Sequence, residues 1–256
     1  MDIISRAWKA AAVGGAIAAA RARELRRASR PPVYLDIGAR GGLSARWKFV
    51  HAARLIRPVF VEADPDEADR LKREYPGASV IPFALGDVDG ESAELKITRE
   101  PGRSSLLEPD TTVLEQFGAE PWEVVRRVPI TLHRLDQVWP VKLAPPDFVK
   151  IDVQGFELRV LRGFGDLLNH VRGIELEVVL VPVYRQQPCL GEVVDFLRSS
   201  GFGLVRLASM GLYGGREMIE FNAFCVRQDR QRSPHVRMWK DVNGIGSLRR
   251  LVVWGY

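Results

Sequence analysis

Three segments of the 256-residue chain place acidic or glycine residues where an apolar run ends. They are Asp36-Ile-Gly38-Ala-Arg40-Gly41, Glu62, and Lys150-Ile-Asp152 with Glu157 close behind. A strand that stops at a glycine turn before a helix lets its backbone approach a ligand closely. An acid at the end of the neighbouring strand can accept hydrogen bonds from both hydroxyls of a ribose. These residue types predict a nucleoside-binding site.

The first glycine turn separates two classes of nucleotide site. A dinucleotide fingerprint, Gly-x-Gly-x-x-Gly, needs glycine at position 40, where this chain has Arg40. The Asp-x-Gly-x-x-Gly pattern resembles the first motif of S-adenosylmethionine-dependent methyltransferases. We therefore expect Asp36, Gly38, Arg40 and Gly41 to form part of a cofactor site.

Two further strand ends complete this prediction. Glu62 follows Gly38 by 24 residues and is expected to bind the ribose. The alternative is an acid beside Asp64 that caps a helix or faces solvent. Phe83 and Ala84 end the third strand, where an adenine ring would lie. Phe83 can stack on that ring, or it can be an ordinary core residue.

The segment from Phe148 to Glu157 places a charge inside an apolar strand. Burying Lys150 in a central strand is costly unless it is paired. We expect Asp152 and Glu157 at the carboxyl end of the sheet, on the same side as Gly38, because ligands bind in that crevice in open sheets. The alternatives are a helix cap for Asp152 and a surface position for Lys150, but neither explains both residues together.

Strand and helix patterns alternate from Pro31 onward, which predicts a parallel sheet with helices on both faces. Two later strands are expected to close the sheet as a hairpin-like pair. The expected strands are Val33–Ile37, Val59–Glu62, Ser79–Ala84, Phe148–Val153, Gly173–Leu180, Leu204–Ala208 and Glu220–Arg227. The expected helices are Leu43–Leu55, Asp66–Tyr75, Phe156–Arg162 and Glu192–Ser200.

The regular pattern is interrupted by an insertion, residues 88–146. Here Ser92–Thr98 and Val124–Leu132 read as strands that alternate or pair, with a loop at residues 101–105 and a helical stretch at Thr111–Phe117 between them. A connection of this length within a compact domain is usually functional. We expect it to be a lid or binding loop that determines acceptor specificity.

The charge of the chain is concentrated at its ends. Residues 1–30 and 227–256 each carry seven Lys/Arg and two acidic residues, while the whole chain has a formal net charge of +5. We therefore divide the chain into a basic helical arm (1–30), one domain (31–227) and a basic extension (228–256). The basic ends predict contact with anionic surfaces, a peripheral membrane or a protein partner, or else solvated arms. Two cysteines without Cys-x-x-Cys spacing favour a reducing cytoplasm.

Five segments in order resemble the FkbM-type methyltransferases. They are Asp36–Gly42, Val61–Pro65, Ala84–Asp87, Ser104–Leu106 and Lys150–Gly155 with Glu157. The resemblance implies a Rossmann-like class I methyltransferase fold: a mostly parallel seven-stranded sheet with an antiparallel C-terminal strand. It also implies methyl transfer from S-adenosylmethionine to oxygen, often a hydroxyl of a sugar or natural product. The family usually has asparagine at position 40 and glutamate at position 154; Arg40 can still reach a carboxylate, whereas Gln154 is not expected to act as a base.

A sugar hydroxyl is a poor nucleophile at neutral pH, so a nearby base would accelerate its methylation. Asp152 is the first candidate, and its alternative role is to orient the amino group of the cofactor. Glu157, Glu177 and His133 are further candidates, although a lone histidine in the insertion can be purely structural. Ser104 and Ser105 would line the acceptor side or shape a turn. Asp152, Glu157 and Glu177 could also gather around a magnesium ion, which the sequence leaves open.

Two other functions remain open at this point. The basic ends would suit a nucleic-acid methyltransferase, but no Asn-Pro-Pro-Tyr follows the fourth strand, so we expect a small-molecule or glycan acceptor instead. A non-catalytic nucleotide-binding or scaffold protein is the other alternative. The sequence does not identify the acceptor.

Overall fold

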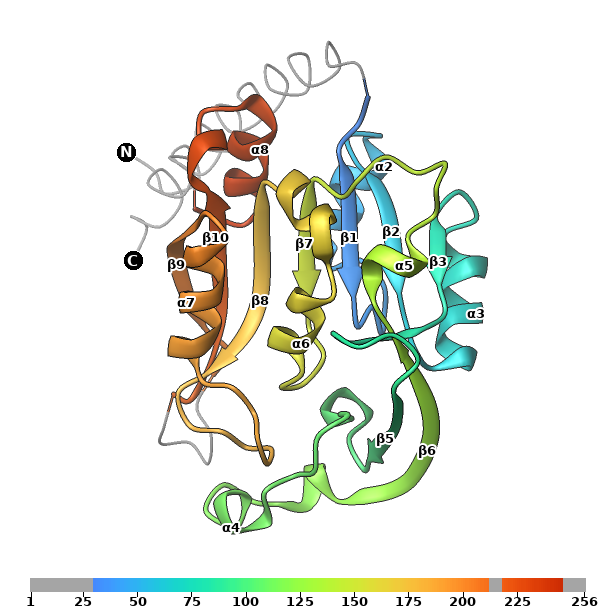
Figure 1. Cartoon of the computed structure of the whole chain (residues 1–256), viewed down its shortest axis with the longest axis vertical. Coiled ribbons are helices and arrows are strands. Elements are labelled where there is room, and N and C mark those ends of the chain that lie inside the picture. The colour runs from blue at the N-terminus through green and yellow to red at the C-terminus, as the bar shows by residue number, and fades with distance from the viewer. Residues whose placement is uncertain (1–29, 212–217, 246–256) are drawn as a thin grey trace, which may run out of the picture.

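A computed structural model describes residues 30–211 and 218–245. Its main sheet has seven strands in the order β3-β2-β1-β7-β8-β10-β9 (Figure 1). The five strands from β3 to β8 are parallel, and β10 is antiparallel to both of its neighbours. This confirms the predicted fold class. The strands are β1 (Val33–Ile37), β2 (Arg57–Val61), β3 (Ser79–Ile81), β7 (Phe148–Ile151), β8 (Gly173–Val179), β9 (Phe202–Ser209) and β10 (Glu220–Arg227).

Helices cover both faces of this sheet, because consecutive strand residues point to opposite sides. Leu35 and Val149 belong to one apolar core with α5, α6 and α7, whereas Tyr34 and Phe148 belong to a second core with α2, α3 and α8. In Figure 1, α6 and α7 lie in front of the sheet. The helices are α2 (Ala45–Ala52), α3 (Pro65–Glu74), α5 (Leu135–Val138), α6 (Glu157–Arg162), α7 (Leu190–Ser199) and α8 (Pro234–Val242).

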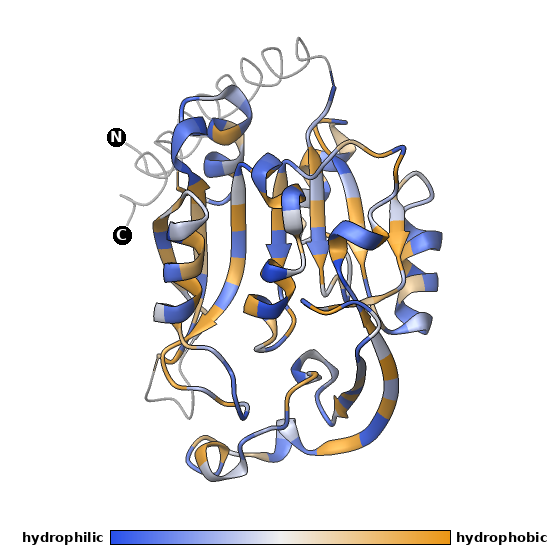
Figure 2. Cartoon of the chain, in the orientation of Figure 1, coloured by the Kyte–Doolittle hydropathy of each residue, from blue (hydrophilic) through white to orange (hydrophobic). Residues whose placement is uncertain are grey.

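The helix α3 shows how local sequence sets an element that borders the site. Asp64 caps the helix by accepting a hydrogen bond from the backbone amide of Asp66, and Pro65 occupies the first helical position, where its missing N–H costs nothing. Ala68 and Leu71 are buried against the sheet. Figure 2 shows the outer side of α3 as mainly hydrophilic and the central strands as largely hydrophobic, as expected for a surface helix on a buried sheet.

The insertion forms a second, three-stranded sheet that projects beyond the carboxyl ends of the main strands (Figure 1). Strand β5 (Ser92–Thr98) pairs antiparallel with β6 (Val124–His133), which confirms the predicted pairing. The end of β6 pairs in parallel with β4 (Ala84–Leu85). The predicted strand Ser79–Ala84 is therefore wrong as one element: β3 pairs with β2, and the chain then leaves the main sheet for β4. The insertion also contains α4 (Thr111–Leu114) and short 3-10 turns at Pro101–Arg103 and Glu120–Trp122.

Sequence periodicity missed part of the C-terminal segment. The helix α8 buries Val236, Met238 and Trp239 against the sheet, and the Trp239 ring stacks 5.9 Å from Phe148. Residues 234–242 are thus part of the folded domain, not only a basic extension. Expectations for residues 1–29 and 246–256 lie outside the described residues. Within the described ranges, no helix has the length and apolarity needed to cross a bilayer.

Candidate functional site

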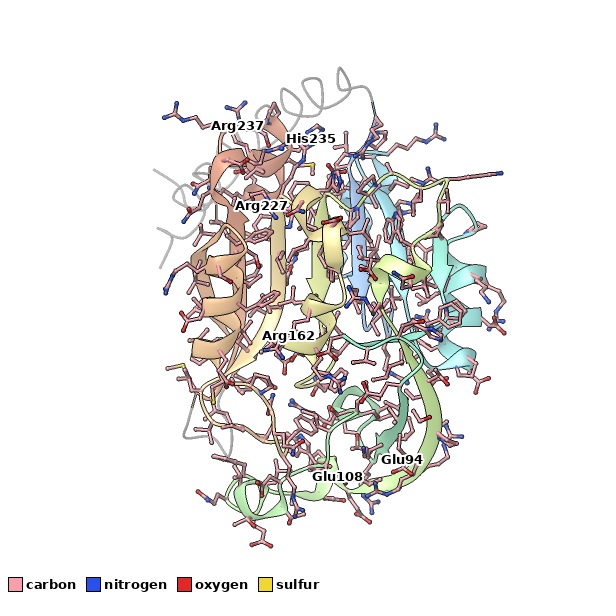
Figure 3. All side chains as sticks on the ribbon, viewed as in Figure 1. Glu94, Glu108, Arg162, Arg227, His235 and Arg237 are labelled. Carbon is pink, nitrogen blue, oxygen red and sulfur yellow. The ribbon has the colours of Figure 1, made fainter. Side chains whose placement is uncertain are left out.

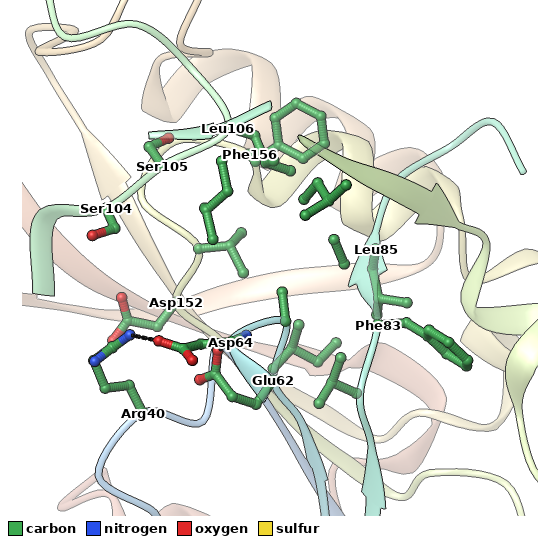
Figure 4. A pocket seen from close by; sticks show the side chains of 18 of the residues that line it. Arg40, Glu62, Asp64, Phe83, Leu85, Ser104, Ser105, Leu106, Asp152 and Phe156 are labelled. Carbon is green, nitrogen blue, oxygen red and sulfur yellow. Dashed lines mark hydrogen bonds and ion pairs between the residues drawn. The ribbon is translucent and has the colours of Figure 1, made fainter. Parts of the chain in front are cut away.

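A cavity of about 270 Å³ lies between the carboxyl ends of β1, β2 and β7 and the β5–β6 insertion (Figure 4). The strand order reverses between β1 and β7, where open sheets bind ligands. The cavity includes six of the residues predicted from sequence: Gly38, Arg40, Glu62, Phe83, Ala84 and Asp152. The insertion contributes apolar walls: Leu95, Ile97, Leu106 and Ile130.

Gly38 lies where the glycine turn approaches the neighbouring strand end most closely. Its φ is +74°, and a Cβ atom built on it would lie 1.9 Å from the carbonyl oxygen of Asp152. Its amide N–H donates to the carbonyl of Val61 at 3.0 Å, which fixes the turn against β2. Both the conformation and the lack of space therefore require glycine here.

Two later residues of the turn contact the start of α3, the helix that follows β2. Arg40 Nη2 donates to Asp64 Oδ2 at 2.8 Å, and this ion pair lies at the cavity in Figure 4. The amide of Gly41 donates to Glu67 Oε1 at 2.6 Å. Hydrogen bonding from Arg70, together with the Gly41 amide, lowers the pKa of Glu67 to about 2. Gly41 thus anchors the turn and does not line the cavity.

Glu62 is a buried carboxyl in the cavity wall. Its Oε1 accepts a hydrogen bond from the amide of Asp64 at 2.9 Å, and burial raises its pKa above the ordinary value. The capping alternative is wrong, because Asp64 is the residue that caps α3. Glu62 is therefore held in place with its carboxylate at the cavity.

Phe83 lies at the opposite end of the same cavity. Its side chain is 39% exposed, so it is not an ordinary core residue. Its ring lies 4.6 Å from the His133 imidazole. His133 itself is not among the cavity residues, and its Nδ1 lies 3.3 Å from Asp89 Oδ1. The structure thus places His133 beside Phe83 but away from Asp152.

Asp152 begins the turn that follows β7 and lines the cavity. Lys150 Nζ donates to its Oδ2 at 3.1 Å, and Gln154 Nε2 donates to its Oδ1 at 3.1 Å. Burial acts to raise the pKa of Asp152, but the charge and hydrogen bond of Lys150 outweigh it and hold this pKa below the ordinary value. The carboxylate is therefore charged at neutral pH.

Glu157 stabilises the same turn but does not line the cavity. Its Oε1 accepts hydrogen bonds from the amides of Val153 at 3.1 Å and Gly155 at 3.2 Å. Burial raises the pKa of Glu157 to about 7, although these amides act in the opposite direction. The side chain is buried and is not among the cavity residues. Its contacts are those of a residue that shapes the turn.

The two serines of the insertion also have defined contacts. Ser105 Oγ donates to the carbonyl of Gln154 at 2.6 Å and accepts from the amide of Leu107 at 3.0 Å. Ser104 Oγ accepts from the amide of Thr98 at 3.2 Å. Both serines line the cavity. They shape a loop of the insertion, and the hydrogen bond from Ser105 to Gln154 joins this loop to the turn after β7.

Three residues near this turn were missed from sequence. The hydroxyl of Tyr184 lies 2.7 Å from the carbonyl of Arg103 and 3.1 Å from Gln154 Oε1. Arg103 Nη1 lies 3.2 Å from both carboxylate oxygens of Glu220. These contacts tie the insertion to the main sheet. The residues are 81 and 117 positions apart in the sequence, so no local pattern could reveal them.

The proposed magnesium ligands do not form a metal centre. Glu157 faces backbone amides, and Glu177 accepts from Gln154 Nε2 at 3.2 Å. Burial, together with a hydrogen bond to Glu220, raises the pKa of Glu177 well above its ordinary value, which disfavours a charged ligand. Among the described residues, no group of three or more His, Cys, Asp and Glu side chains is arranged to hold a metal ion.

Figure 3 shows charged side chains that lie apart from the cavity. Glu94 and Glu108 both bond to Arg127 on the outer side of the insertion, while His235 and Arg237 lie on α8, at the opposite end of the molecule (Figure 3). None of the side chains labelled in Figure 3 is among the cavity residues.

Comparison with known proteins gives one family and several distant structures. Residues 36–204 match the family described as the methyltransferase FkbM domain. No curated protein sequence matches the chain. The chain is similar to precorrin-6y C5,15-methyltransferase from Geobacter metallireducens (16% identity, TM-score 0.38, covering 82% of this chain and 87% of that one). It is also similar to magnesium protoporphyrin IX methyltransferase from Synechocystis with bound S-adenosylmethionine (12% identity, TM-score 0.43, covering 86% and 79%).

Proposed function

The chain belongs to the FkbM methyltransferase family and depends on S-adenosylmethionine; on this premise we propose that it methylates a hydroxyl oxygen of a sugar or natural product. The observation that carries the proposal is the buried Glu62 carboxylate, which shares one cavity with Gly38 and Asp152. This arrangement supports a ribose at Glu62 and a reacting centre near Asp152.

The residues present fit the donor. Glu62 would accept hydrogen bonds from the ribose hydroxyls, and Phe83 with Ala84 would contact the adenine. Gly38 leaves its backbone open to the ligand, since it has no side chain, and Arg40 is placed to bind the carboxylate of the methionine part. Asp36 and Gly41 do not line the cavity, so we assign them to shaping the glycine turn.

Asp152 is the proposed base. When bound, S-adenosylmethionine supplies an electrophilic methyl group, and its carbon–sulfur bond breaks as the bond to the acceptor oxygen forms. The acceptor proton would pass to the Asp152 carboxylate, which is charged at neutral pH. Alignment of the reactants can contribute roughly 7–11 kcal/mol at best, and a positioned base about 10²–10⁴-fold. Glu157 and His133 are secondary candidates, because neither lines the cavity.

Calorimetry with S-adenosylmethionine tests the donor site. We expect Glu62→Ala to weaken binding by about tenfold or more, because hydrogen bonds to a charged group contribute roughly 1.5–3 kcal/mol. Asp69→Ala is the matched control: it removes an exposed acid of α3 that pairs with Lys72 and is not among the cavity residues. Unchanged affinity in Glu62→Ala would contradict the ribose assignment.

A second variant tests the base. Asp152→Asn should lower turnover by about 10²-fold or more while changing donor affinity little. An equal loss in both would instead assign Asp152 to the amino group of the donor. Because the acceptor is unidentified, turnover is to be measured as S-adenosylhomocysteine release with a panel of sugars and natural products.

Partner and location are proposals on the same basis. We propose a small-molecule or glycan acceptor. The domain at residues 31–227, extended by the helix α8 that packs on its sheet, is proposed to act in the cytoplasm with residues 88–146 as its specificity element. The basic ends are proposed to contact an anionic membrane surface or a protein.

A further inference from the structure

Lys150 is the central member of a row of ionisable residues that crosses three parallel strands. The pairing register places it between Asp36 on β1 and Glu175 on β8. Both carboxyls are buried, and Tyr34, two residues before Asp36, is buried on the same face. A central strand of this kind is normally an uninterrupted apolar run, so the row calls for a specific explanation.

The contacts form one ion pair and one group of three charged residues. Arg46 of α2 bonds to Glu175, which supplies that carboxylate with its own cation. Lys150 Nζ lies 3.1 Å from Asp152 Oδ2 and 3.6 Å from Asp36 Oδ1. Lys150 is thus shared by one carboxyl beneath the glycine turn and one at the cavity.

Because Asp152 lines the cavity, its pairing with Lys150 bears on function. Asp152 is half-buried, with 35% of its side chain exposed, and partial desolvation disfavours its charged form when no cation is close. We propose that Lys150 is a positioning residue that keeps Asp152 ionised at the cavity, with Asp36 as its second anchor. The proposal rests on the proposed function for the use made of that charge. The charge state of Asp152 itself can be measured without any ligand.

The electrostatic surroundings support this direction. Burial acts to lower the pKa of Lys150, but Asp36 and Asp152 outweigh it and raise this pKa above the ordinary value. Burial raises the pKa of Asp36 to about 6. The Lys150 ammonium acts against this rise, but it lies farther from Asp36 than from Asp152. Other charged groups also act on Asp152 or Lys150. These groups are Arg103, Glu157, Glu175 and Glu177. Arg46 interacts with Glu175, and Tyr34 interacts with Asp36 and Glu175.

The test is a carboxyl ¹³C NMR titration of the full chain labelled at aspartate. Asp152→Asn and Asp36→Asn identify the two signals. In Lys150→Met we expect the midpoint of the Asp152 titration to lie at least about one pH unit higher than in the wild type, and the Asp36 midpoint to rise as well. Lys150→Arg retains the charge and should restore the Asp152 midpoint.

The matched control is Lys48→Met, which removes a lysine that pairs with Glu74 on the surface. It changes the net charge equally and should leave both midpoints in place. An unchanged Asp152 midpoint in Lys150→Met would overturn the proposal, as would a rise confined to Asp36. A purely structural lysine would lower the melting temperature without moving the Asp152 signal.

Lys150→Met leaves the buried Asp36 and the half-buried Asp152 without their cation and can prevent folding. In that case Lys150→Met is combined with Asp36→Asn, which keeps the local charge balanced, and compared with Asp36→Asn alone. A higher Asp152 midpoint in the double variant supports the proposal, and an equal midpoint overturns it. Calorimetry of the wild type with S-adenosylhomocysteine is run in parallel. Absence of binding there would count against the proposed function and leave the titration result intact.

Discussion

Two turns follow neighbouring central strands of the sheet and meet at the cavity, yet they are stabilised by different means. The turn after β1 is fixed by its backbone: Gly38 has a positive φ, and the amides of Gly38 and Ala39 both donate to the carbonyl of Val61. The turn after β7 is fixed by side chains, which include the Glu157 carboxylate and the Ser105 hydroxyl. The first turn therefore depends on a glycine that has no side chain, whereas the second depends on hydrogen bonds made by side chains.

The difference extends to how each turn responds to pH. The bonds from Gly38 and Ala39 to Val61 contain no ionisable group. The Glu67 carboxylate that accepts from Gly41 has a pKa of about 2 and stays charged at ordinary pH. The turn after β7 includes Gln154 at a φ of +53°, a conformation that non-glycine residues adopt at a cost. It is held by Glu157, whose pKa is about 7, and by the charged pair of Lys150 and Asp152. We expect the first turn to be insensitive to pH and the second turn to be sensitive to it.

The largest expected loss of stability is for Gly38→Ala, and Gly41→Ala in the same turn is its comparison. Gly38→Ala would place a Cβ atom 1.9 Å from a backbone oxygen, so we expect a loss of more than about 3 kcal/mol in unfolding free energy, or no folding. Gly41→Ala has a similar φ of +80° but nothing within 4 Å of its Cβ. It should cost only about 1 kcal/mol. Urea unfolding measures both; equal losses would show that backbone strain, not the contact with Asp152, governs this turn.

Glu157 provides the pH test of the second turn. Its pKa in the folded chain is about 7, above the ordinary 4.5, so the protonated form favours folding. The stability that it contributes is complete below about pH 4.5 and is lost as the pH rises through 7. Glu157→Gln should therefore reduce the fall in unfolding free energy between pH 5 and pH 7.5 by roughly 1–3 kcal/mol.

The control for this experiment is Glu192, which accepts a backbone hydrogen bond from Cys189 at the start of α7 but is exposed. Glu192→Gln should leave the slope of stability against pH as in the wild type. Other buried carboxyls with raised pKa values, such as Asp36 and Glu175, contribute to the slope in both proteins. If Glu157→Gln and the wild type showed parallel curves, the turn would not depend on this carboxyl.

A moderate effect is expected at Ser105. Ser105→Ala removes a buried hydroxyl and leaves the carbonyl of Gln154 without this donor, which should cost about 1–3 kcal/mol. Ser104→Ala is the neighbouring control: its hydroxyl is only half-buried, and the expected loss is about 1 kcal/mol. The difference in melting temperature between the two variants measures how far the second turn relies on the insertion.

The smallest effect on stability is expected at Arg40. The ion pair with Asp64 is partly exposed, with 38% of the arginine side chain accessible, so Arg40→Ala should change the unfolding free energy by no more than about 0.5 kcal/mol. Its effect should appear in donor affinity, because the side chain lines the cavity. A loss above 1 kcal/mol in urea unfolding would mean that a side chain also stabilises the first turn.

Sequence reasoning located the first turn better than the second. The strand Val33–Ile37 was predicted with its observed bounds, and the glycine pattern that follows identifies a backbone conformation directly. Glu62 was also placed correctly at the cavity, because the end of a parallel strand fixes the direction in which the chain arrives.

The second turn depends on contacts that no local pattern encodes. Asp152 was expected at the carboxyl edge and lines the cavity, but Glu157 faces backbone amides from the first turn of α6. Tyr184 and Ser105 contact the same glutamine from distant parts of the chain. The helix α8 was missed because its apolar residues lie in a polar, basic segment, and their burial depends on the contacts of Trp239 with Phe148 and Phe224.

The insertion leaves and re-enters the domain at nearly the same point. The amide of Gly90 donates to the carbonyl of Leu132, and the amide of Leu132 donates to the carbonyl of Glu91. Chain segments whose ends lie side by side can be lengthened or exchanged at little cost in loop entropy. In evolutionary terms, the arm built on β5 and β6 is a module that can be exchanged while the sheet and its glycine turn are inherited unchanged; on the proposed function, such an exchange would change acceptor preference.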